Sequence, residues 1–165
     1  MPDRRTLIGL GAGALGAWLL VGGTGRSGPA RAARAGDPRF ALSPAQWRQR
    51  LSPAAYRVLR EEATERPFTS ALLGEKRRGT FACAGCGLPL FASTAKYDSG
   101  TGWPSFTAAL PGAIGTATDF KLGYPRTEEH CRRCGGHLGH IFDDGPPPTG
   151  QRHCINGVAL RFIPA

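Results

Sequence analysis

Two stretches of the sequence share the pattern C-x-x-C-G-x-x-L: Cys83-Ala84-Gly85-Cys86-Gly87-Leu88-Pro89-Leu90 and Cys131-Arg132-Arg133-Cys134-Gly135-Gly136-His137-Leu138. In each stretch, a tight turn followed by glycine would point both thiolates at one ion. Because 44 residues separate the two pairs, a shared ion would cross-link two distant hairpins. We therefore predict one structural zinc ion, closed to substrate, with the ligands Cys83, Cys86, Cys131 and Cys134.

Two other interpretations of the C-x-x-C pairs stay open. Unmetallated pairs in an oxidising compartment would be candidates for disulfides. A C-x-x-C pair is also the motif of thioredoxin-like redox sites, although neither pair opens a βαβ unit in this chain. The spacing favours zinc over both.

Outward from the cysteine pairs, the chain after Gly79 consists of short apolar or alternating runs separated by glycine and proline. These runs cover residues 80–82, 88–92, 120–122, 137–142 and 153–162. Strands at this density, with no long helical pattern between them, indicate antiparallel β structure. Upstream, Ser43-Pro44 and Ser52-Pro53 each place an N-cap residue before a proline, which predicts two short helices.

The N-terminal 35 residues have the features of an export signal. Arg4-Arg5 precede an apolar, glycine-rich run from Leu7 to Val21, and Ala33-Arg34-Ala35 supplies the small residues that a signal peptidase recognises. We expect a twin-arginine signal over residues 1–35, a single domain over residues 36–165, and export to the periplasm. An uncleaved membrane anchor and an ordinary secretory signal are the alternatives, since the apolar run is short and diluted by glycine.

The charge of the chain does not indicate a nucleic-acid partner. The net charge is +9, but residues 1–35 hold five arginines and one acidic residue. The remaining chain carries 16 basic and 11 acidic residues, a net charge of +5, and these residues are spread along the sequence rather than gathered in blocks. Such a distribution is typical of a solvated surface.

Cys154 is the odd cysteine of five and is the candidate reactive residue. It lies in the run Arg152-His153-Cys154-Ile155-Asn156. Strand alternation would place Arg152, Cys154 and Asn156 on one face. The guanidinium would depress the thiol pKa, and the amide would position a polar substrate group. The alternative is a buried structural cysteine in an apolar strand.

Three further motifs supply candidate site residues. In His137-Leu138-Gly139-His140, an odd separation would put the imidazoles on opposite faces of a regular strand, but Gly139 permits a bulge that would bring both to one site. Asp144 lies in a loop rich in proline and glycine, where acids are by default turn residues. Trp103 lies in a loop, where it would either join the core or form the wall of an apolar substrate pocket.

Taken together, these residues resemble the methionine sulfoxide reductase B family. The resemblance covers nearly everything from Leu51 to Phe162. It rests on an ordered set of motifs: Thr64-Glu65-Arg66-Pro67-Phe68, both C-x-x-C-G pairs, Gly102-Trp103-Pro104-Ser105-Phe106, the His-Leu-Gly-His run and Arg152-His153-Cys154-Ile155-Asn156. Enzymes of this kind restore methionine from its sulfoxide, one enzyme for each sulfoxide epimer.

The resemblance implies a mainly β fold of two antiparallel sheets, a β-tent, with the zinc away from the active site. It implies that the Cys154 thiolate attacks the sulfur of the R-sulfoxide, free or in an oxidised protein, and becomes a sulfenic acid. The other roles that it implies are packing against the substrate methyl for Trp103, handling of the sulfoxide oxygen and its proton for His137 and His140, and tuning of the site for Arg152, Asp144 and Asn156.

The chain departs from the family pattern at one position. Many members carry a cysteine where this chain has Thr101, and that cysteine converts the sulfenic acid into a disulfide that thioredoxin reduces. With the other four sulfurs held by zinc, Cys154 would be regenerated by an external thiol reductant, directly or through a mixed disulfide. We expect the protein to act as a monomer.

Two other function classes remain as alternatives. The first is a zinc-stabilised β module without enzymatic activity that binds a protein or a small ligand. The second is a nucleic-acid-binding zinc ribbon, although the chain lacks basic residues interleaved with aromatic residues on a strand face.

Overall fold

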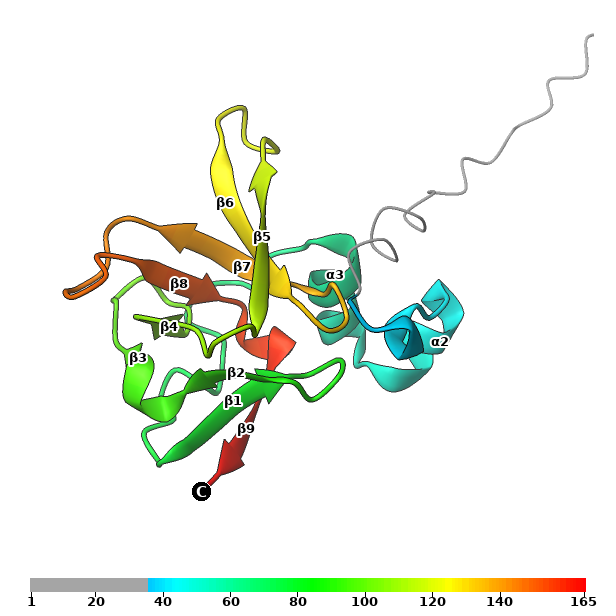
Figure 1. The fold of residues 1–165 in the computed structure, drawn as a ribbon, viewed down its shortest axis with the longest axis horizontal. Helices are drawn as coiled ribbons and strands as arrows, with labels where there is room; N and C mark the ends of the chain where they lie inside the picture. The colour runs from blue at the N-terminus through cyan, green and yellow to red at the C-terminus, as the bar shows by residue number, and fades with distance from the viewer. Residues whose placement is uncertain (1–35) are drawn as a thin grey trace, which may run out of the picture.

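The computed structural model describes residues 36–165, so the export signal predicted over residues 1–35 lies outside the described residues. Figure 1 shows a larger sheet above a smaller one, with two short helices to one side. Among the described residues, no helix has the length and apolar character that a membrane crossing requires.

Two short helices open the folded unit, as the serine-proline pairs predict. After a 3-10 turn at Pro38–Phe40, α2 spans Pro44–Arg50 and α3 spans Pro53–Glu61. The Ser43 hydroxyl accepts a hydrogen bond from the Gln46 backbone N–H, and the Gln46 side chain accepts one from the Ser43 N–H. This capping box satisfies N–H groups that the first turn of a helix leaves without partners.

The strands form two antiparallel sheets, which confirms the predicted mainly β fold class. The smaller sheet has the order β2-β1-β9, with the bounds Pro89–Ala92, Gly79–Cys83 and Leu160–Pro164. The larger sheet has the order β3-β4-β8-β7-β6-β5, with the bounds Lys96–Tyr97, Ser105–Phe106, Arg152–Ile155, His137–Phe142, Arg126–Cys131 and Ile114–Asp119. Two further 3-10 turns, η2 at Ser93–Ala95 and η3 at Gly157–Ala159, connect strands.

Aromatic side chains between the two sheets form the centre of the core. Phe81 and Phe91 come from the smaller sheet and Phe106 from the larger, and none of the three is exposed. The Phe91 and Phe106 rings stack with centroids 4.3 Å apart, and Phe81 meets Phe106 at 5.0 Å. The helix α3 covers β7 and η3, with Leu59 fully buried in the same core.

Two expectations about strands were wrong. Residues 120–122 form the turn of the β5–β6 hairpin rather than a strand, because Gly123, at a φ of 83°, closes the turn by donating its N–H to the Phe120 carbonyl. The run 153–162 is not one strand, because η3 separates β8 from β9 and these strands lie in different sheets.

The hairpin strands β5 and β6 have no apolar alternation and were not predicted. The sequence of β6, Arg-Thr-Glu-Glu-His-Cys, is mostly polar, yet Glu128, Glu129 and His130 are all buried. Glu128 and Glu129 have hydrogen-bonding partners on other strands, which local sequence does not reveal, and His130 is hydrogen-bonded to Glu128 within β6.

Candidate active site and metal centre

The two C-x-x-C pairs form knuckles at the ends of two strands. Cys83 ends β1 and Cys131 ends β6. The carbonyl of each accepts a hydrogen bond of 2.8 Å, from the Gly87 N–H and the Gly135 N–H respectively. Both glycines have positive φ, 73° and 66°, a conformation that glycine adopts without steric cost. The turn geometry predicted from the sequence is confirmed.

The four knuckle sulfurs gather at one point, with every pair within 4.8 Å. Contacts run between the knuckles: the Cys83 and Cys134 sulfurs are 3.7 Å apart and the Cys86 and Cys131 sulfurs 3.5 Å. Tetrahedral ligation with zinc–sulfur bonds of about 2.3 Å requires sulfur–sulfur distances of about 3.8 Å. The donor set and its spacing therefore fit one soft, four-coordinate metal ion.

The rival interpretations of the knuckles find no support in this geometry. All five cysteines of the chain are free thiols, so no disulfide is formed. Each knuckle leads from one strand into the next, β1 into β2 and β6 into β7, whereas a thioredoxin-like pair would open a helix.

The sulfurs of Cys83, Cys86, Cys131 and Cys134 together form the metal cluster. Arg60 of α3 lies against it. Its guanidinium donates to the Cys134 carbonyl at 3.0 Å and to the Cys134 sulfur at 3.6 Å, and it stacks 4.2 Å from the centre of the Trp47 ring. Hydrogen bonds with the other three thiols, chiefly Cys131, hold the pKa of the Cys134 thiol well below its ordinary value, and the charge of Arg60 adds to the effect. A guanidinium here offsets part of the negative charge that four thiolates bring to one ion.

Cys154 lies in a row of side chains that crosses the larger sheet. The strand register pairs Tyr97 with Ser105, Ser105 with Cys154, Cys154 with His140, and His140 with Glu128. Residues directly paired across antiparallel strands project from the same face of the sheet. These five side chains therefore share one face.

The opposite face of β8 belongs to the core. His153 packs edge-on against Phe91, with ring centroids 5.7 Å apart, and shares a 2.8 Å hydrogen bond through Nδ1 with Glu129 Oε2. Glu129 is fully buried. Burial raises its pKa and outweighs the hydrogen bond with His153, which lowers it. The predicted alternation holds, since Cys154 and Asn156 line one pocket while His153 faces inward.

A bulge in β7 brings both candidate histidines to the pocket face. Glu129 pairs with Gly139 and His130 with His137, so β7 carries one residue more than β6 over this stretch. The bulge that the sequence suggested is confirmed. At Gly139, a Cβ atom would lie 1.9 Å from the Cys154 carbonyl oxygen, so only glycine allows β8 this close.

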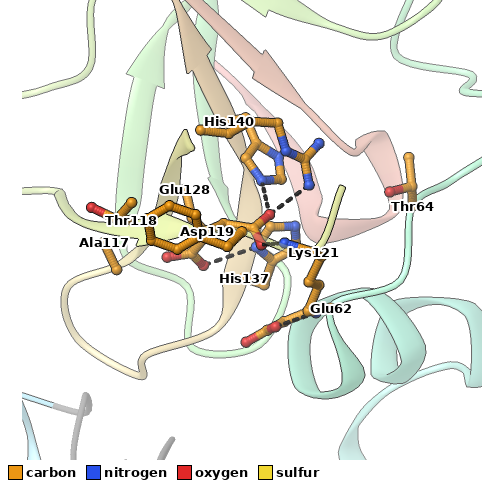
Figure 2. A pocket seen from close by; sticks show the side chains of 11 residues that line it. Glu62, Thr64, Ala117, Thr118, Asp119, Lys121, Glu128, His137 and His140 are labelled. Atoms are coloured by element: carbon orange, nitrogen blue, oxygen red, sulfur yellow. Dashed lines mark hydrogen bonds and ion pairs between the residues drawn. The ribbon is translucent and has the colours of Figure 1, made fainter. Parts of the chain in front are cut away.

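Each histidine is held by a carboxylate from the β5–β6 hairpin. His137 Nδ1 lies 2.8 Å from Glu128 Oε1, and His140 Nε2 lies 2.8 Å from Asp119 Oδ2, which Arg126 also contacts. The two imidazole centroids are 5.4 Å apart. In Figure 2, both rings point toward their carboxylates within a pocket that also includes Thr64.

Burial and hydrogen bonds set the charges of these groups. Burial raises the pKa of Glu128, but hydrogen bonds from His130 and His137 outweigh it and hold the pKa at about 2. Burial also opposes the ionisation of Asp119, yet hydrogen bonds from the Lys121 backbone, His140 and Arg126 hold its pKa well below the usual range. Burial lowers the pKa of His140, against the opposing hydrogen bond to Asp119. Both carboxylates are therefore ionised, and His140 is neutral near pH 7.

Arg152 and Asp144 form a bidentate ion pair beside the row. The Arg152 Nε and Nη2 atoms each donate to an Asp144 carboxylate oxygen at 2.8 Å. The guanidinium also stacks 4.5 Å from the centre of the Phe142 ring. Asp144 is thus more than a turn residue, because it orients the buried Arg152 side chain.

Trp103 and Asn156 are joined through Glu65. The Trp103 indole N–H donates to the Glu65 carbonyl at 2.9 Å, and the Glu65 N–H donates to the Asn156 amide oxygen at 2.7 Å. The Asn156 amide nitrogen donates to the Leu138 carbonyl at 2.8 Å, and the Glu65 carboxylate accepts from the Gly157 N–H. Asn156 therefore uses its amide to hold backbone segments together.

The pocket in front of Cys154 combines polar and apolar walls. Its lining residues are Thr64, Trp103, Arg126, Gly139, His140, Phe142, Cys154 and Asn156. The pocket that holds His137 and Glu128 shares Thr64, Arg126 and His140 with it, so the two adjoin. Trp103 lines this pocket and is only partly buried, as the pocket-wall interpretation predicts.

The pKa of the Cys154 thiol is raised, contrary to expectation. Burial raises it, and the charge of Arg152 and hydrogen bonds from Thr101 and Arg152 lower it only in part. Arg152 acts in the predicted direction, but the loss of hydration outweighs its effect.

Three site residues were missed by sequence reasoning: Asp119, Glu128 and Glu65. Asp119 and Glu128 come from strands that carry no apolar pattern, and they reach histidines 21 and 9 residues away. Glu65 belongs to the motif Thr64-Glu65-Arg66-Pro67-Phe68, so the resemblance marked the segment without indicating its contacts.

Comparisons with known proteins agree with this geometry. A family model described as the SelR domain matches residues 51–164. The "Peptide methionine sulfoxide reductase MsrB" of Thiobacillus denitrificans is 56% identical over 121 residues, covering 73% of this chain and 92% of that protein. The protein of the same name from Bradyrhizobium diazoefficiens is 53% identical over 129 residues, covering 78% and 93%.

A mammalian relative is also similar. The "Methionine-R-sulfoxide reductase B2, mitochondrial" of Rattus norvegicus is 47% identical over 135 residues, covering 77% of this chain and 78% of that protein. The similarity thus spans the whole region that contains the metal cluster and the Cys154 pocket.

We expect Cys134→Ser to lose the bound metal and most of the folded protein. An incomplete ligand shell forfeits much of a binding free energy on the order of 10 kcal/mol that supports folding at such sites. Metal content of the purified protein and far-UV circular dichroism with and without a chelator measure the effect. The matched control is Cys154→Ser, a thiol outside the cluster, which should keep its metal. A folded, metal-bearing Cys134→Ser protein would contradict the structural role of the cluster.

Proposed function

The chain belongs to the SelR domain family, and from that membership we propose that it reduces the R epimer of methionine sulfoxide to methionine at Cys154. It is accordingly a peptide-methionine (R)-S-oxide reductase, an oxidoreductase, and not a module without activity. The observation that carries the assignment of the nucleophile is the place of Cys154. It is the one cysteine outside the metal cluster, and it lines a pocket with Trp103 and His140.

The proposed reaction transfers the sulfoxide oxygen to Cys154. The sulfur of Cys154 attacks the sulfoxide sulfur and forms an S–S bond, and the sulfoxide oxygen is protonated. The oxygen then passes to the Cys154 sulfur as its bond to the methionine sulfur and the new S–S bond both break. Methionine leaves, and Cys154 becomes a sulfenic acid. The methionine sulfur is reduced by two electrons and the cysteine sulfur is oxidised by two. The sulfoxide oxygen takes up one proton and the Cys154 thiol gives up one, so the step neither consumes nor releases a proton.

The histidines are placed to handle that proton. His137 uses Nδ1 for Glu128 and His140 uses Nε2 for Asp119, which leaves Nε2 of one and Nδ1 of the other without a hydrogen bond to residues 36–165. The raised pKa of Cys154 keeps the thiol protonated until substrate arrives. A proton taken from the thiol can therefore pass to the sulfoxide oxygen within the pocket.

Trp103 and Phe142 are the apolar walls against which the substrate methyl would pack. Asn156 is a positioning residue rather than a group that touches the substrate, because backbone groups of Glu65 and Leu138 occupy its amide. Arg152, oriented by Asp144, supplies positive charge beside the thiolate as it forms.

Regeneration requires an external thiol, because Thr101 stands where a resolving cysteine would be. An attacking thiol forms a mixed disulfide with Cys154 and releases water, and a second thiol frees Cys154 as a new disulfide forms. A thioredoxin-like protein or a small thiol would serve as the reductant.

The metal is proposed to be one structural Zn²⁺ ion. Four thiolates would hold it, and a full shell leaves no position for substrate. The ion would tie the end of β1 to the end of β6.

The location is proposed to be the periplasm, reached by a twin-arginine signal over residues 1–35. Arg4-Arg5 and the apolar run that follows support this. Export of a folded, metal-loaded protein would protect the cluster thiolates from oxidation.

We expect Cys154→Ser to reduce R-methionine sulfoxide no faster than dithiothreitol alone, because a hydroxyl cannot supply the sulfur nucleophile. An epimer-resolved assay of the mature protein with dithiothreitol measures the rate. Metal content and melting temperature should match wild type. Activity of this variant above background would sink the assignment of the nucleophile, and wild-type activity toward the S epimer only would sink the assignment of the substrate.

We expect a single turnover without reductant to leave Cys154 as a sulfenic acid that a trapping reagent captures. In Thr101→Cys, the new thiol should form a disulfide with Cys154 instead, since position 101 is where many members of the family carry the cysteine that attacks the sulfenic acid. Intact-mass measurement and peptide mapping distinguish the two products. A wild-type disulfide between Cys154 and a cluster cysteine, with metal released, would contradict the one-cysteine cycle.

We expect replacement of Arg4 and Arg5 by lysine to block accumulation of the protein in the periplasm, because twin-arginine export depends on the arginine pair. Fractionation followed by immunoblotting measures the distribution. Unchanged accumulation would point to a general secretory signal.

A further inference from the structure

Arg126 places a guanidinium in the pocket in front of Cys154. It lies on β6 two residues before Glu128, so it projects from the same face of the larger sheet as the row that contains His140 and Cys154. Its side chain lines this pocket and the adjoining one, and is 17% exposed. The guanidinium is therefore mostly buried and faces the space in which the substrate would bind.

Only one nitrogen of this guanidinium has a hydrogen-bond partner among residues 36–165. Nη2 of Arg126 donates to Asp119 Oδ2, the same oxygen that lies 2.8 Å from His140 Nε2. Nε is buried without a partner, and Nη1 has none either. A guanidinium has five N–H donors in a fixed fork, and a buried donor that stays unpaired is costly. The unused donors are therefore available to an oxygen of a bound ligand.

Two other side-chain nitrogens of the pocket already have backbone partners. The Trp103 indole N–H donates to the Glu65 carbonyl, and the Asn156 amide nitrogen donates to the Leu138 carbonyl. Both hydrogen bonds hold segments of the fold together, so neither nitrogen is placed primarily for a substrate.

His140 offers the pocket an acceptor rather than a donor. Its Nε2 faces the ionised Asp119 carboxylate, which can only accept, so Nε2 carries the hydrogen of the neutral ring. Nδ1 is then the unprotonated nitrogen. The Thr64 hydroxyl is the other candidate donor in the lining, but it is neutral, and hydrogen bonds from a charged donor are roughly twice as strong.

We propose that Arg126 is a catalytic residue that binds the sulfoxide oxygen through the donors that Asp119 leaves free. The inference rests on the function proposed above. Negative charge grows on this oxygen as the Cys154 sulfur attacks, and a fixed cationic donor stabilises it. His140 accepts the thiol proton at Nδ1 and passes it to the oxygen that Arg126 holds. Asp119 keeps the guanidinium and the imidazole beside each other.

This contact also contributes to the choice of epimer. A sulfoxide sulfur carries an oxygen, a methyl group, a methylene group and a lone pair. With the oxygen at Arg126, the methyl at Trp103 and Phe142, and the methylene toward the pocket opening, only one epimer can turn its sulfur toward Cys154. The other epimer would place a methyl group against the guanidinium or leave the oxygen against the aromatic wall.

The test is ligand binding to zinc-loaded Cys154→Ser protein, which holds the substrate without turnover. Calorimetry compares the R-sulfoxide, the S-sulfoxide and the thioether of N-acetylmethionine N-methylamide, none of which has a carboxylate that would bind an arginine. Adding Arg126→Gln should weaken binding of the R-sulfoxide about tenfold, because a hydrogen bond from a charged donor is lost. Binding of the thioether and of the S-sulfoxide should not change.

Turnover gives a second readout with Cys154 intact. Arg126→Gln should lower kcat/KM for the same R-sulfoxide by about tenfold to a hundredfold. The matched control is Arg77→Gln, which removes an exposed guanidinium paired with Glu75, outside the residues that line either pocket. This control should keep the wild-type affinities and rate.

Equal weakening of all three ligands by Arg126→Gln, or no weakening of the R-sulfoxide, would overturn the proposal. So would a loss of R-sulfoxide binding in Thr64→Val that Arg126→Gln does not show. Should Arg126→Gln lose zinc or unfold, the Arg126 Nε–H resonance of ¹⁵N-labelled Cys154→Ser protein decides. A shift with the R-sulfoxide but not with the thioether supports the contact, and the same response to both overturns it.

The wild-type assay separates this inference from the proposed function. An inactive wild type whose Cys154→Ser form still distinguishes the R-sulfoxide from the thioether through Arg126 would refute only the function. An active wild type whose R-sulfoxide affinity does not depend on Arg126 would refute only the role of Arg126.

Discussion

The convergence of four cysteine sulfurs from two hairpins is the constraint on which the rest of the structure depends. Cys83 ends a strand of the smaller sheet and Cys131 ends a strand of the larger, so the cluster joins the two sheets where these two strands end. The stacked phenylalanines join them through the core, and Arg60 joins α3 to the same cluster. With β6 held in this way, the β5–β6 hairpin is anchored at its base, and the carboxylates that it carries stand at a defined distance from β7.

The larger sheet uses its two faces for different chemistry. One face is packed against the smaller sheet and contains a buried polar pair, Glu129 and His153, whose side chains share a hydrogen bond. The other face carries the row that includes Cys154 and His140. Because side chains alternate along a strand, a shift of one residue in β8 would bury the thiol and expose His153. The short strand β4, which pairs with Cys154 through Ser105, holds that register from the other side.

Ionised carboxylates behind the histidines determine how the imidazoles can act. Glu128 occupies Nδ1 of His137 and Asp119 occupies Nε2 of His140, so the two rings present different nitrogens to the pocket. Such partners fix the orientation and tautomer of a neutral imidazole. The raised pKa keeps a proton on the Cys154 thiol. The proposed reaction needs one proton for the sulfoxide oxygen, and the thiol can supply it.

The sequence alone determined the elements of this protein whose signal is local. The spacing of the cysteines identified the four cluster thiols and the one left over, the serine-proline pairs identified both helices, and Gly139 indicated the bulge. The tertiary structure alone decided how these parts act. Asp119 meets His140 across 21 residues, from a strand whose polar sequence gives no alternation. Burial raises the pKa of Cys154 and outweighs the lowering effect of the Arg152 guanidinium, which the sequence places two residues away. Local patterns record which groups are present, whereas burial and pairing across strands depend on contacts between distant segments and determine the charge that each group carries.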